Sequence, residues 1–327
     1  MSETYLIRAD ASPKIGAGHV MRTLALGQML RDHGQSVHYA TTTTTRAILD
    51  RIADEGFVLH RMQGEGEIDG KMHDDSMYCL ETARRIDAKW IILDGYQFGT
   101  SYQRSVKSSG FNLMCIDDMA SCHIVADVVV NQNIKACDIR YSIEPYTRLY
   151  AGPHHALMRS EFIQEKGRLH RNPSRKIKNI LVTMGASNID TIILQVLKGL
   201  ECSHLPRICI KAVLGSDQSH DDEIRSFIES SHHHIEFMRN VGPEMARLMA
   251  WADLGIFGCG STVLEGRYLD LPMICFQLVD NQKTNCAPSS TYDNDLYAGL
   301  LSSLSTVGQF FVMADFEVSP FDVTTIL

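Results

Sequence analysis

The sequence predicts an α/β protein with two doubly wound domains that face each other across a cleft. With 327 residues, the chain exceeds the size at which a single hydrophobic core usually stops growing. Short apolar runs alternate with amphipathic stretches, as in parallel sheets covered by helices. This alternation stops near residue 150 and restarts near residue 176. We therefore predict an N-terminal domain over residues 1–150, a linker over 151–175 and a C-terminal domain over 176–327.

The N-terminal half is predicted to begin with a strand over residues 4–8. A glycine-containing loop follows, and residues 20–33 then carry apolar side chains at helical spacing. The elements predicted after it are a strand at 36–40, a helix at 46–55 and strands at 90–93, 112–116 and 128–130. The last of these strands is expected to close this half.

Residues 151–175 interrupt the pattern with Gly152, Pro153 and Pro173, which is typical of a linker. The predicted strands beyond it cover residues 179–184, 208–214, 235–238, 254–257 and 273–276, and the helices 191–200, 224–230, 245–250 and 263–269. Doubly wound sheets bind ligands beyond the carboxyl ends of their strands. The motifs described below all lie at such ends.

Composition excludes several classes of protein. A net charge of −8 argues against a nucleic-acid partner, which would require a basic face. It is compatible with a phosphate ligand held by backbone amides. The nine scattered cysteines form no Cys-x-x-Cys pair and suggest no disulfide framework. Residues 1–8 lack the apolar stretch of a signal peptide, and no apolar run approaches the ~20 residues of a membrane span. We expect a cytoplasmic protein with no membrane insertion.

Three consecutive histidines, at positions 232–234, invite comparison with a metal-binding tract. Adjacent side chains point in different directions, and the sequence shows no second cluster of ligands. We therefore predict neither a metal site nor a cofactor.

The first candidate motif is Gly16-Ala17-Gly18-His19, with Asp10 before it and Arg22 after it. The glycines would let a ligand approach the backbone, and the start of the following helix would offer free N–H groups. It is not a dinucleotide fingerprint, because the third glycine is missing. The spacing is equally compatible with a tight turn and with a site in which His19 acts as a base.

A second glycine-rich loop opens a helix at Gly260-Ser261-Thr262, which is typical of an anion site. Glu265 follows Ser261 by one helical turn, so the two share a face. Its carboxylate could accept hydrogen bonds from a ribose diol, or it could simply favour the start of the helix. Further polar residues come after the next strand, at Asp280, Asn281 and Gln282.

Other polar residues follow predicted strands. Asp94 and Tyr96 follow one strand of the N-terminal half, and Asp117 and Asp118 follow the next. Strand-terminal aspartates often cap turns, but these could also line the cleft and contact a substrate. Gly185 and Ser187 open the C-terminal half and could contact a phosphate.

Together these motifs resemble the family of UDP-2,4-diacetamido-2,4,6-trideoxy-β-L-altropyranose hydrolases of pseudaminic acid biosynthesis. The matching pieces cover most of residues 4–285 and include residues 8–12, 15–22, 93–96, 116–118 and 157–162 and the late Gly-Ser-Thr…Glu…Asp-Asn-Gln set. The family is similar to inverting glycosyltransferases with two Rossmann-like domains, the GT-B type. The chain departs from the family at residues 184–188 and 270–272. These differences affect the expected sugar specificity more than the expected UDP site.

The resemblance implies hydrolysis of a UDP-sugar with inversion at the anomeric carbon. It implies that His19 is the base that activates water and that Tyr96 and Asn281 hold the sugar. Ser261 and Thr262 would bind the diphosphate and Glu265 the uridine ribose. The expected partner is thus a small-molecule UDP-sugar.

Two other functions share these features. A GT-B glycosyltransferase would use an acceptor hydroxyl in place of water, and fold alone does not separate the two reactions. A nucleotide-sugar binder without activity is the third hypothesis. The pairing of His19 with Tyr96 argues against it, because a binder needs no base.

Overall fold

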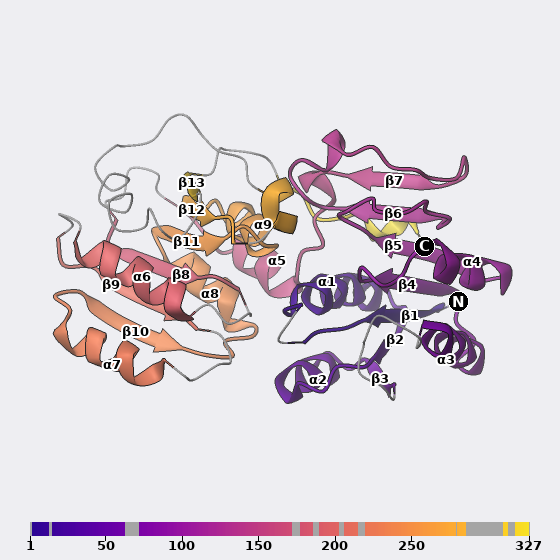
Figure 1. Ribbon diagram of the computed structural model, residues 1–327, viewed down its shortest axis with the longest axis horizontal. Helices are drawn as coiled ribbons and strands as arrows, with labels where there is room; N and C mark the ends of the chain where they lie inside the picture. The colour runs from indigo at the N-terminus through magenta and orange to yellow at the C-terminus, as the bar shows by residue number, and fades with distance from the viewer. Residues whose placement is uncertain are drawn as a thin grey trace. The chain divides into compact units, whose positions relative to one another are not determined.

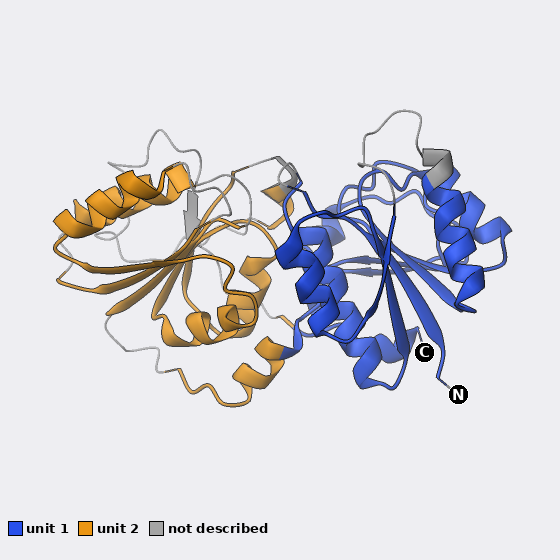
Figure 2. Ribbon diagram, turned by 90° about the horizontal axis from the view of Figure 1, so that it is seen from below, with its two compact units in different colours: residues 1–160, 319–327 blue, residues 161–318 orange. Residues whose placement is uncertain are grey.

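The computed structural model describes residues 2–12, 15–62, 72–171, 177–185, 190–202, 206–214, 220–278, 280–285, 310–312 and 318–326. The chain divides into two compact units (Figure 2). Unit 1 comprises Met1–Ser160 together with Ser319–Leu327, and unit 2 comprises Glu161–Val318.

Unit 1 is built on a parallel sheet in the order β3-β2-β1-β4-β5-β6-β7 (Figure 1). Its strands are β1 (Thr4–Ala9), β2 (Ser36–Thr41), β3 (Val58–Arg61), β4 (Trp90–Asp94), β5 (Asn112–Ile116), β6 (Val128–Asn131) and β7 (Arg148–Ala151). The strand order reverses between β1 and β4, so their carboxyl ends form a topological switch point. Ala9 pairs with Asp94 there, and Asp94 pairs with Ile116 of β5.

The helices of unit 1 cover both faces of this sheet (Figure 2). They are α1 (Gly18–Asp32), α2 (Arg46–Asp54), α3 (Met72–Arg85) and α4 (Thr100–Ser108), with 3₁₀ turns η1 (Ala136–Asp138), η2 (Pro153–His155) and η4 (Val323–Thr325). Leu80 of α3 and Val106 of α4 are buried with Leu6 and Ile91 of the sheet in one apolar cluster. Burial of such side chains is the main force that holds the helices on the sheet.

Unit 2 repeats the plan with a sheet in the order β10-β9-β8-β11-β12-β13, parallel except for β13. Its strands are β8 (Asn179–Thr183), β9 (Cys209–Val213), β10 (His234–Met238), β11 (Leu254–Gly258), β12 (Met273–Phe276) and β13 (Phe310–Val312). The helices are α5 (Ser160–Lys166), α6 (Asp190–Glu201), α7 (Asp221–Ser230), α8 (Glu244–Trp251), α9 (Thr262–Tyr268) and the 3₁₀ helix η3 (Asp280–Asn285). The switch point of this sheet lies between β8 and β11, where Thr183 pairs with Phe257.

The predicted class, two doubly wound α/β units with parallel sheets, is confirmed. Several elements of unit 1 were absent from the prediction, namely β3, α3, α4 and β7, and β6 does not close the sheet as expected. The edge strands β3 and β7 are largely exposed, so they lack the apolar run that marks a buried strand. None of the helices within the described ranges is long and apolar enough to cross a bilayer.

The division of the chain also differs from the predicted one, because residues 319–327 fold onto unit 1. The ring of Phe321 packs edge-on against Tyr150 and His155, at centroid distances of 5.5 and 6.4 Å. The Phe321 amide donates to the Ala156 carbonyl at 2.8 Å. These contacts attach the C-terminal segment, and residues 151–160 beside it, to the first unit.

Candidate active site

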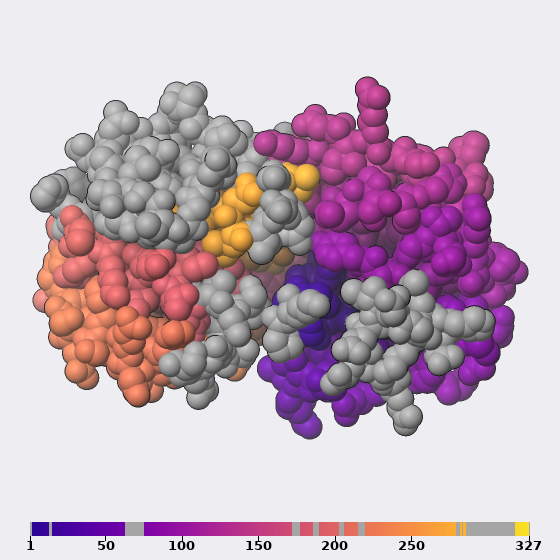
Figure 3. All heavy atoms as spheres, in the orientation of Figure 1, coloured from indigo at the N-terminus to yellow at the C-terminus, as the bar shows by residue number. Residues whose placement is uncertain are grey.

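The residues singled out in the first half of the chain meet at the switch point of unit 1. His19 and Arg22 lie in the first turns of α1, and Asp94 is the last residue of β4. The loops after β1 and β4 and the start of α1 lie close together, because β1 and β4 are adjacent parallel strands. Ile15 of the β1–α1 loop and Gly18 at the start of α1 are exposed, and indigo atoms of this N-terminal segment reach the surface in Figure 3.

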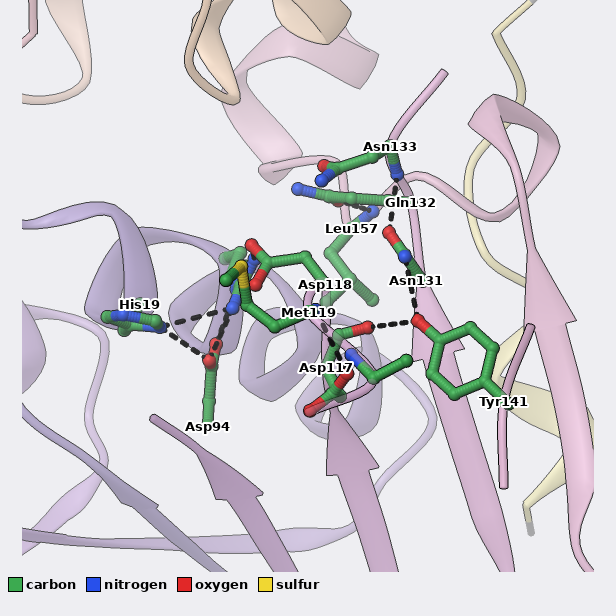
Figure 4. A network of polar contacts seen from close by, with 12 residues as sticks. His19, Asp94, Asp117, Asp118, Met119, Asn131, Gln132, Asn133, Tyr141 and Leu157 are labelled. Atoms are coloured by element: carbon green, nitrogen blue, oxygen red, sulfur yellow. Dashed lines mark hydrogen bonds and ion pairs between the residues drawn. The ribbon is translucent and has the colours of Figure 1, made fainter. Parts of the chain in front are cut away.

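Asp94 joins His19 and Arg22 in a buried network, and Figure 4 labels His19 and Asp94 in it. Nδ1 of His19 lies 2.6 Å from Oδ1 of Asp94, and Arg22 donates to both carboxylate oxygens from Nη2 and Nε, also at 2.6 Å. The Asp94 side chain is fully buried, whereas His19 and Arg22 each keep 8% of their side chains exposed. A bidentate arginine–carboxylate pair of this kind is strong and fixes orientation.

The charges in the network are stabilised by one another. Burial raises the pKa of the Asp94 carboxyl, but Arg22 and His19 outweigh burial and hold this pKa below its ordinary value of 3.8. Burial lowers the pKa of Arg22, but Asp94 and Asp118 raise it well above its ordinary value. Asp94 is therefore a carboxylate, which can only accept hydrogen bonds.

This fixes the tautomer of His19. Nδ1 must carry the proton that Asp94 accepts, so Nε2 of the neutral ring has a lone pair available. The ring of Tyr96 stands edge-on to the His19 ring at a centroid distance of 4.9 Å, and its residue is 48% exposed. The predicted base and the predicted sugar contact are thus neighbours at the edge of unit 1.

Asp94 has a different place from the one predicted. The sequence suggests a substrate contact at the cleft, but the structure buries Asp94 completely. Arg22 and His19 occupy both of its oxygens. Its role is to orient His19 and Arg22.

The aspartate after β5 that contacts this network is Asp118, the second of the two that the sequence places at the end of this strand. Arg22 donates from Nη1 to Oδ2 of Asp118 at 2.9 Å. Oδ1 of the predicted Asp117 instead accepts the amides of Met119 and Ala120 at 3.1 and 2.6 Å (Figure 4). Asp117 therefore caps the turn after β5, the alternative that the sequence leaves open. The adjacent acidic pair in the motif was the available signal for Asp118.

A chain of polar contacts supports that turn. The Tyr141 hydroxyl donates to the Asp117 carbonyl at 2.8 Å, and Asn131 donates to the Tyr141 oxygen at 2.8 Å (Figure 4). Burial raises the pKa of Asp117, while the two turn amides lower it in part. The turn that presents Asp118 is thus anchored to β6.

The remaining predicted residues of unit 1 all have a defined place in the fold. Gly16 has a φ of 74°, which favours glycine, and its amide closes the loop onto the Ser12 carbonyl at 2.8 Å. Gly18 begins α1. Asp10 is buried, ion-paired with Arg8 at 2.6 Å, and accepts the Thr42 amide at 2.7 Å. It ties β1 to the end of β2, and a contact with substrate stays a prediction.

The second glycine-rich loop lies at the switch point of unit 2. Gly260 and Ser261 follow β11, and Thr262 begins α9. The Val263 and Leu264 amides donate back to Gly260 and Ser261, which leaves the Ser261 and Thr262 amides without a recorded partner among the described residues. Glu265 is buried in the first turn of α9, and its amide donates to the Ser261 carbonyl. The loop can therefore offer N–H donors to an anion.

Gly258, the last residue of β11, is required by close packing. A Cβ there would lie 3.0 Å from the backbone oxygen of Met184, whereas a Cβ on Gly260 would meet nothing within 4 Å. We expect Gly258→Ala to lower the free energy of unfolding by about 1–3 kcal/mol, because a backbone atom has to move. Gly260→Ala should change it by less than about 0.5 kcal/mol. Chemical denaturation of both variants checks this, and equal stabilities would contradict it.

The other predicted residues of unit 2 lie at neighbouring strand ends. Gly185 follows β8 with a φ of 96° and is exposed. Ser187 lies outside the described residues. Asp280 and Asn281 begin η3, and Gln282 in the same helix accepts the Leu278 amide at 2.8 Å. Their contacts with a ligand stay predictions.

The histidine tract has a partner that the sequence did not indicate. Glu201 lies with His232 and His233 so that their potential ligand atoms are within 4.8 Å of one another. The Glu201 carboxylate already accepts from the Ser231 hydroxyl and the His232 amide, which lowers its pKa to about 2 against the effect of burial. His233 bonds the Leu200 carbonyl and the Ile208 amide. These contacts hold Glu201 and His233 in place within the cluster.

Comparison with known proteins supports the resemblance inferred from the motifs. No protein-family profile matches the chain. An uncharacterized protein of Methanocaldococcus jannaschii, MJ1062, is 26% identical over 276 residues, which make up 82% of this chain and 54% of that protein. The chain thus spans about half the length of this relative. The UDP-2,4-diacetamido-2,4,6-trideoxy-β-L-altropyranose hydrolase of Campylobacter jejuni is 24% identical over 285 residues, covering 85% of this chain and 93% of that protein.

Solved structures share the fold at low sequence identity. MurG of Acinetobacter baumannii superposes with a TM-score of 0.54 and 16% identity, over 93% of this chain and 83% of that one. The UDP-GlcNAc 2-epimerase of Neisseria meningitidis, solved with UDP-GlcNAc, gives a TM-score of 0.56 at 10% identity, over 92% and 90% of the chains. The chain is therefore similar in sequence to a UDP-diacetamido-trideoxy-altropyranose hydrolase and has the fold of GT-B glycosyltransferases and epimerases.

Proposed function

We propose that this protein is an enzyme that hydrolyses a UDP-linked diacetamido-trideoxy sugar to UDP and the free sugar, with inversion at the anomeric carbon. The observation that carries the proposal is the buried His19–Asp94 pair at the switch point of unit 1. A neutral histidine whose Nδ1 is held by a carboxylate is a general base. The similarity to the Campylobacter hydrolase supports the choice of substrate and of water as the nucleophile.

The proposed reaction has one chemical step. Nε2 of His19 takes a proton from water as the water oxygen forms a bond to the anomeric carbon. The bond from that carbon to the UDP oxygen breaks, and its electron pair leaves with the diphosphate. Asp94 keeps the proton on Nδ1 and holds the ring in place. UDP is a good leaving group, so a second residue that protonates it is not required.

Unit 2 is proposed to bind the nucleotide end of the substrate. The loop amides at Ser261 and Thr262 suit the diphosphate, and Glu265 suits the ribose hydroxyls. Gly185, Asp280 and Gln282 follow neighbouring strands and are proposed as further contacts. Tyr96 and Asn281 are proposed to hold the sugar near the reacting carbon.

The test is the release of UDP from UDP-2,4-diacetamido-2,4,6-trideoxy-β-L-altropyranose in buffer that contains no sugar acceptor. We expect stoichiometric UDP and free sugar, and the first-formed anomer seen by proton NMR should have the opposite configuration to the substrate. UDP-GlcNAc serves as the comparison substrate. Release of UDP only after an acceptor is added would instead favour the glycosyltransferase hypothesis.

A further inference from the structure

The network around His19 contains one cation and two carboxylates. Arg22 contacts both oxygens of Asp94 and, from its third nitrogen, Oδ2 of Asp118 at 2.9 Å. All three side chains are buried or nearly so, with Asp118 the most exposed at 12%. When the His19 ring is neutral, one negative charge is therefore left uncompensated.

The negative charge of Asp94 alone cannot balance the positive charge of a protonated His19. Arg22 binds the same carboxylate through two short contacts, and its Nη2 also lies 3.1 Å from Nδ1 of His19. A protonated His19 would thus lie beside an Asp94–Arg22 pair that has no net charge, and close to the positively charged guanidinium of Arg22. Because uncompensated charge is unfavourable in a buried site, Asp94 and Arg22 alone would disfavour the imidazolium that a base has to form.

We propose that Asp118, acting through Arg22, supplies the negative charge that balances the His19 imidazolium during the reaction. This rests on the proposed function of His19 as the base. Asp118 contacts Arg22 and is a positioning residue, so its effect reaches His19 through the guanidinium that both carboxylates share.

The unpartnered oxygen of Asp118 agrees with this role. Its Oδ1 is buried and has no hydrogen-bond partner among the described residues. A buried acceptor without a donor is uncommon and calls for an explanation, which a functional charge provides. Asp117, the adjacent residue, is by contrast stabilised by two amides of its own turn.

The other charged or titratable groups of the elements around His19 are paired elsewhere. Arg8 and Asp10 of β1 bind each other, and Arg8 also binds Asp75 of α3. Tyr39 of β2 bonds the Thr23 hydroxyl, and burial raises its pKa far above neutrality. Tyr96 of the β4 loop lies edge-on to the His19 ring. Asp117 accepts two amides of its own turn. In the described part of unit 1, Asp118 is the carboxylate besides Asp94 that forms an ion pair with Arg22.

The experiment compares Asp118→Asn and Asp118→Ser, which remove the charge, with Asp118→Glu, which keeps it. Asp75→Asn is the matched control, because Asp75 also pairs with a buried arginine at 2.6 Å. Two readouts are followed against pH: kcat and KM for UDP release, and the ring Cε1–H signal of His19 by NMR. The NMR signal is assigned with His19→Gln.

Both neutral variants should lower the plateau of kcat about ten-fold while KM stays within about two-fold. The acid limb of kcat and the NMR midpoint of His19 should both move to lower pH by about one unit. Asp118→Glu should restore both, and Asp75→Asn should move neither midpoint.

An unchanged NMR midpoint in the neutral variants, or an equal shift in Asp75→Asn, would overturn the role of Asp118. The two proposals can fail separately. If the wild-type protein releases no UDP from the sugar nucleotide, the proposed function is wrong, and the NMR midpoint still decides whether Asp118 balances the charge of His19.

Discussion

His19→Gln is expected to lower kcat for UDP release by about 10²–10⁴-fold, the usual contribution of a general base. The Gln side chain can still donate a hydrogen bond to Asp94, so the buried network keeps a partner at this position. It has no lone pair basic enough to take a proton from water. KM should change little, because the proposed role lies in the chemical step rather than in binding.

His33→Gln is the matched control, since His33 caps the other end of the same helix and bonds the Met29 carbonyl. We expect it to keep wild-type kcat. Full activity of His19→Gln, measured with purified protein of native circular dichroism, would show that another group activates water.

Asp94→Asn is expected to have the largest combined effect on stability and activity. The Asp94 carboxylate is fully buried and compensates Arg22. Removing one partner of a buried ion pair usually costs about 3–5 kcal/mol, and Arg22 would keep only its single contact with Asp118 in place of the bidentate pair with Asp94. We expect a loss of this size in the free energy of unfolding from urea denaturation. Asp50→Asn breaks an exposed pair with Arg46 and should leave the free energy of unfolding nearly unchanged.

The same substitution should also inactivate the folded protein. An Asn amide can donate to Nδ1 of His19, which would place the ring proton on Nε2, where the base needs its lone pair. In a serine protease the corresponding change lowers kcat by about 10⁴-fold through the wrong tautomer, and we expect a loss of that order. An Asp94→Asn protein with wild-type stability and activity would contradict both roles given to the carboxylate.

The places of the candidate residues in the fold could be predicted from the sequence because these residues follow strand ends. Buried strands appear in the sequence as apolar runs, so the polar residues that come after them can be identified without knowledge of the fold. Asp94 at the end of β4 and His19 after the glycine turn are two examples. Parallel strands then bring those ends to one edge of a sheet. Edge strands β3 and β7 were missed because each has only four residues and mixes apolar with charged side chains, so neither forms a long apolar run.

Which aspartate meets Arg22 could not be predicted from the sequence. Asp117 and Asp118 are adjacent and chemically identical. The turn after β5 decides between them, because Ala120 adopts a φ of 49° and its amide binds Asp117. The partner of Glu201 and the return of Phe321 to unit 1 likewise depend on contacts between residues far apart in the chain. Such contacts leave no local pattern.

The most direct test of the central claim is hydrolysis in H₂¹⁸O followed by mass spectrometry of the UDP. If water attacks the anomeric carbon, the UDP keeps its original bridging oxygen and contains no ¹⁸O, and the label first appears in the sugar. The sugar alone is not decisive, since a free anomeric hydroxyl exchanges with water. UDP that contains one ¹⁸O would contradict the proposal, because it would mean that water attacks phosphorus and that His19 activates it for a different reaction.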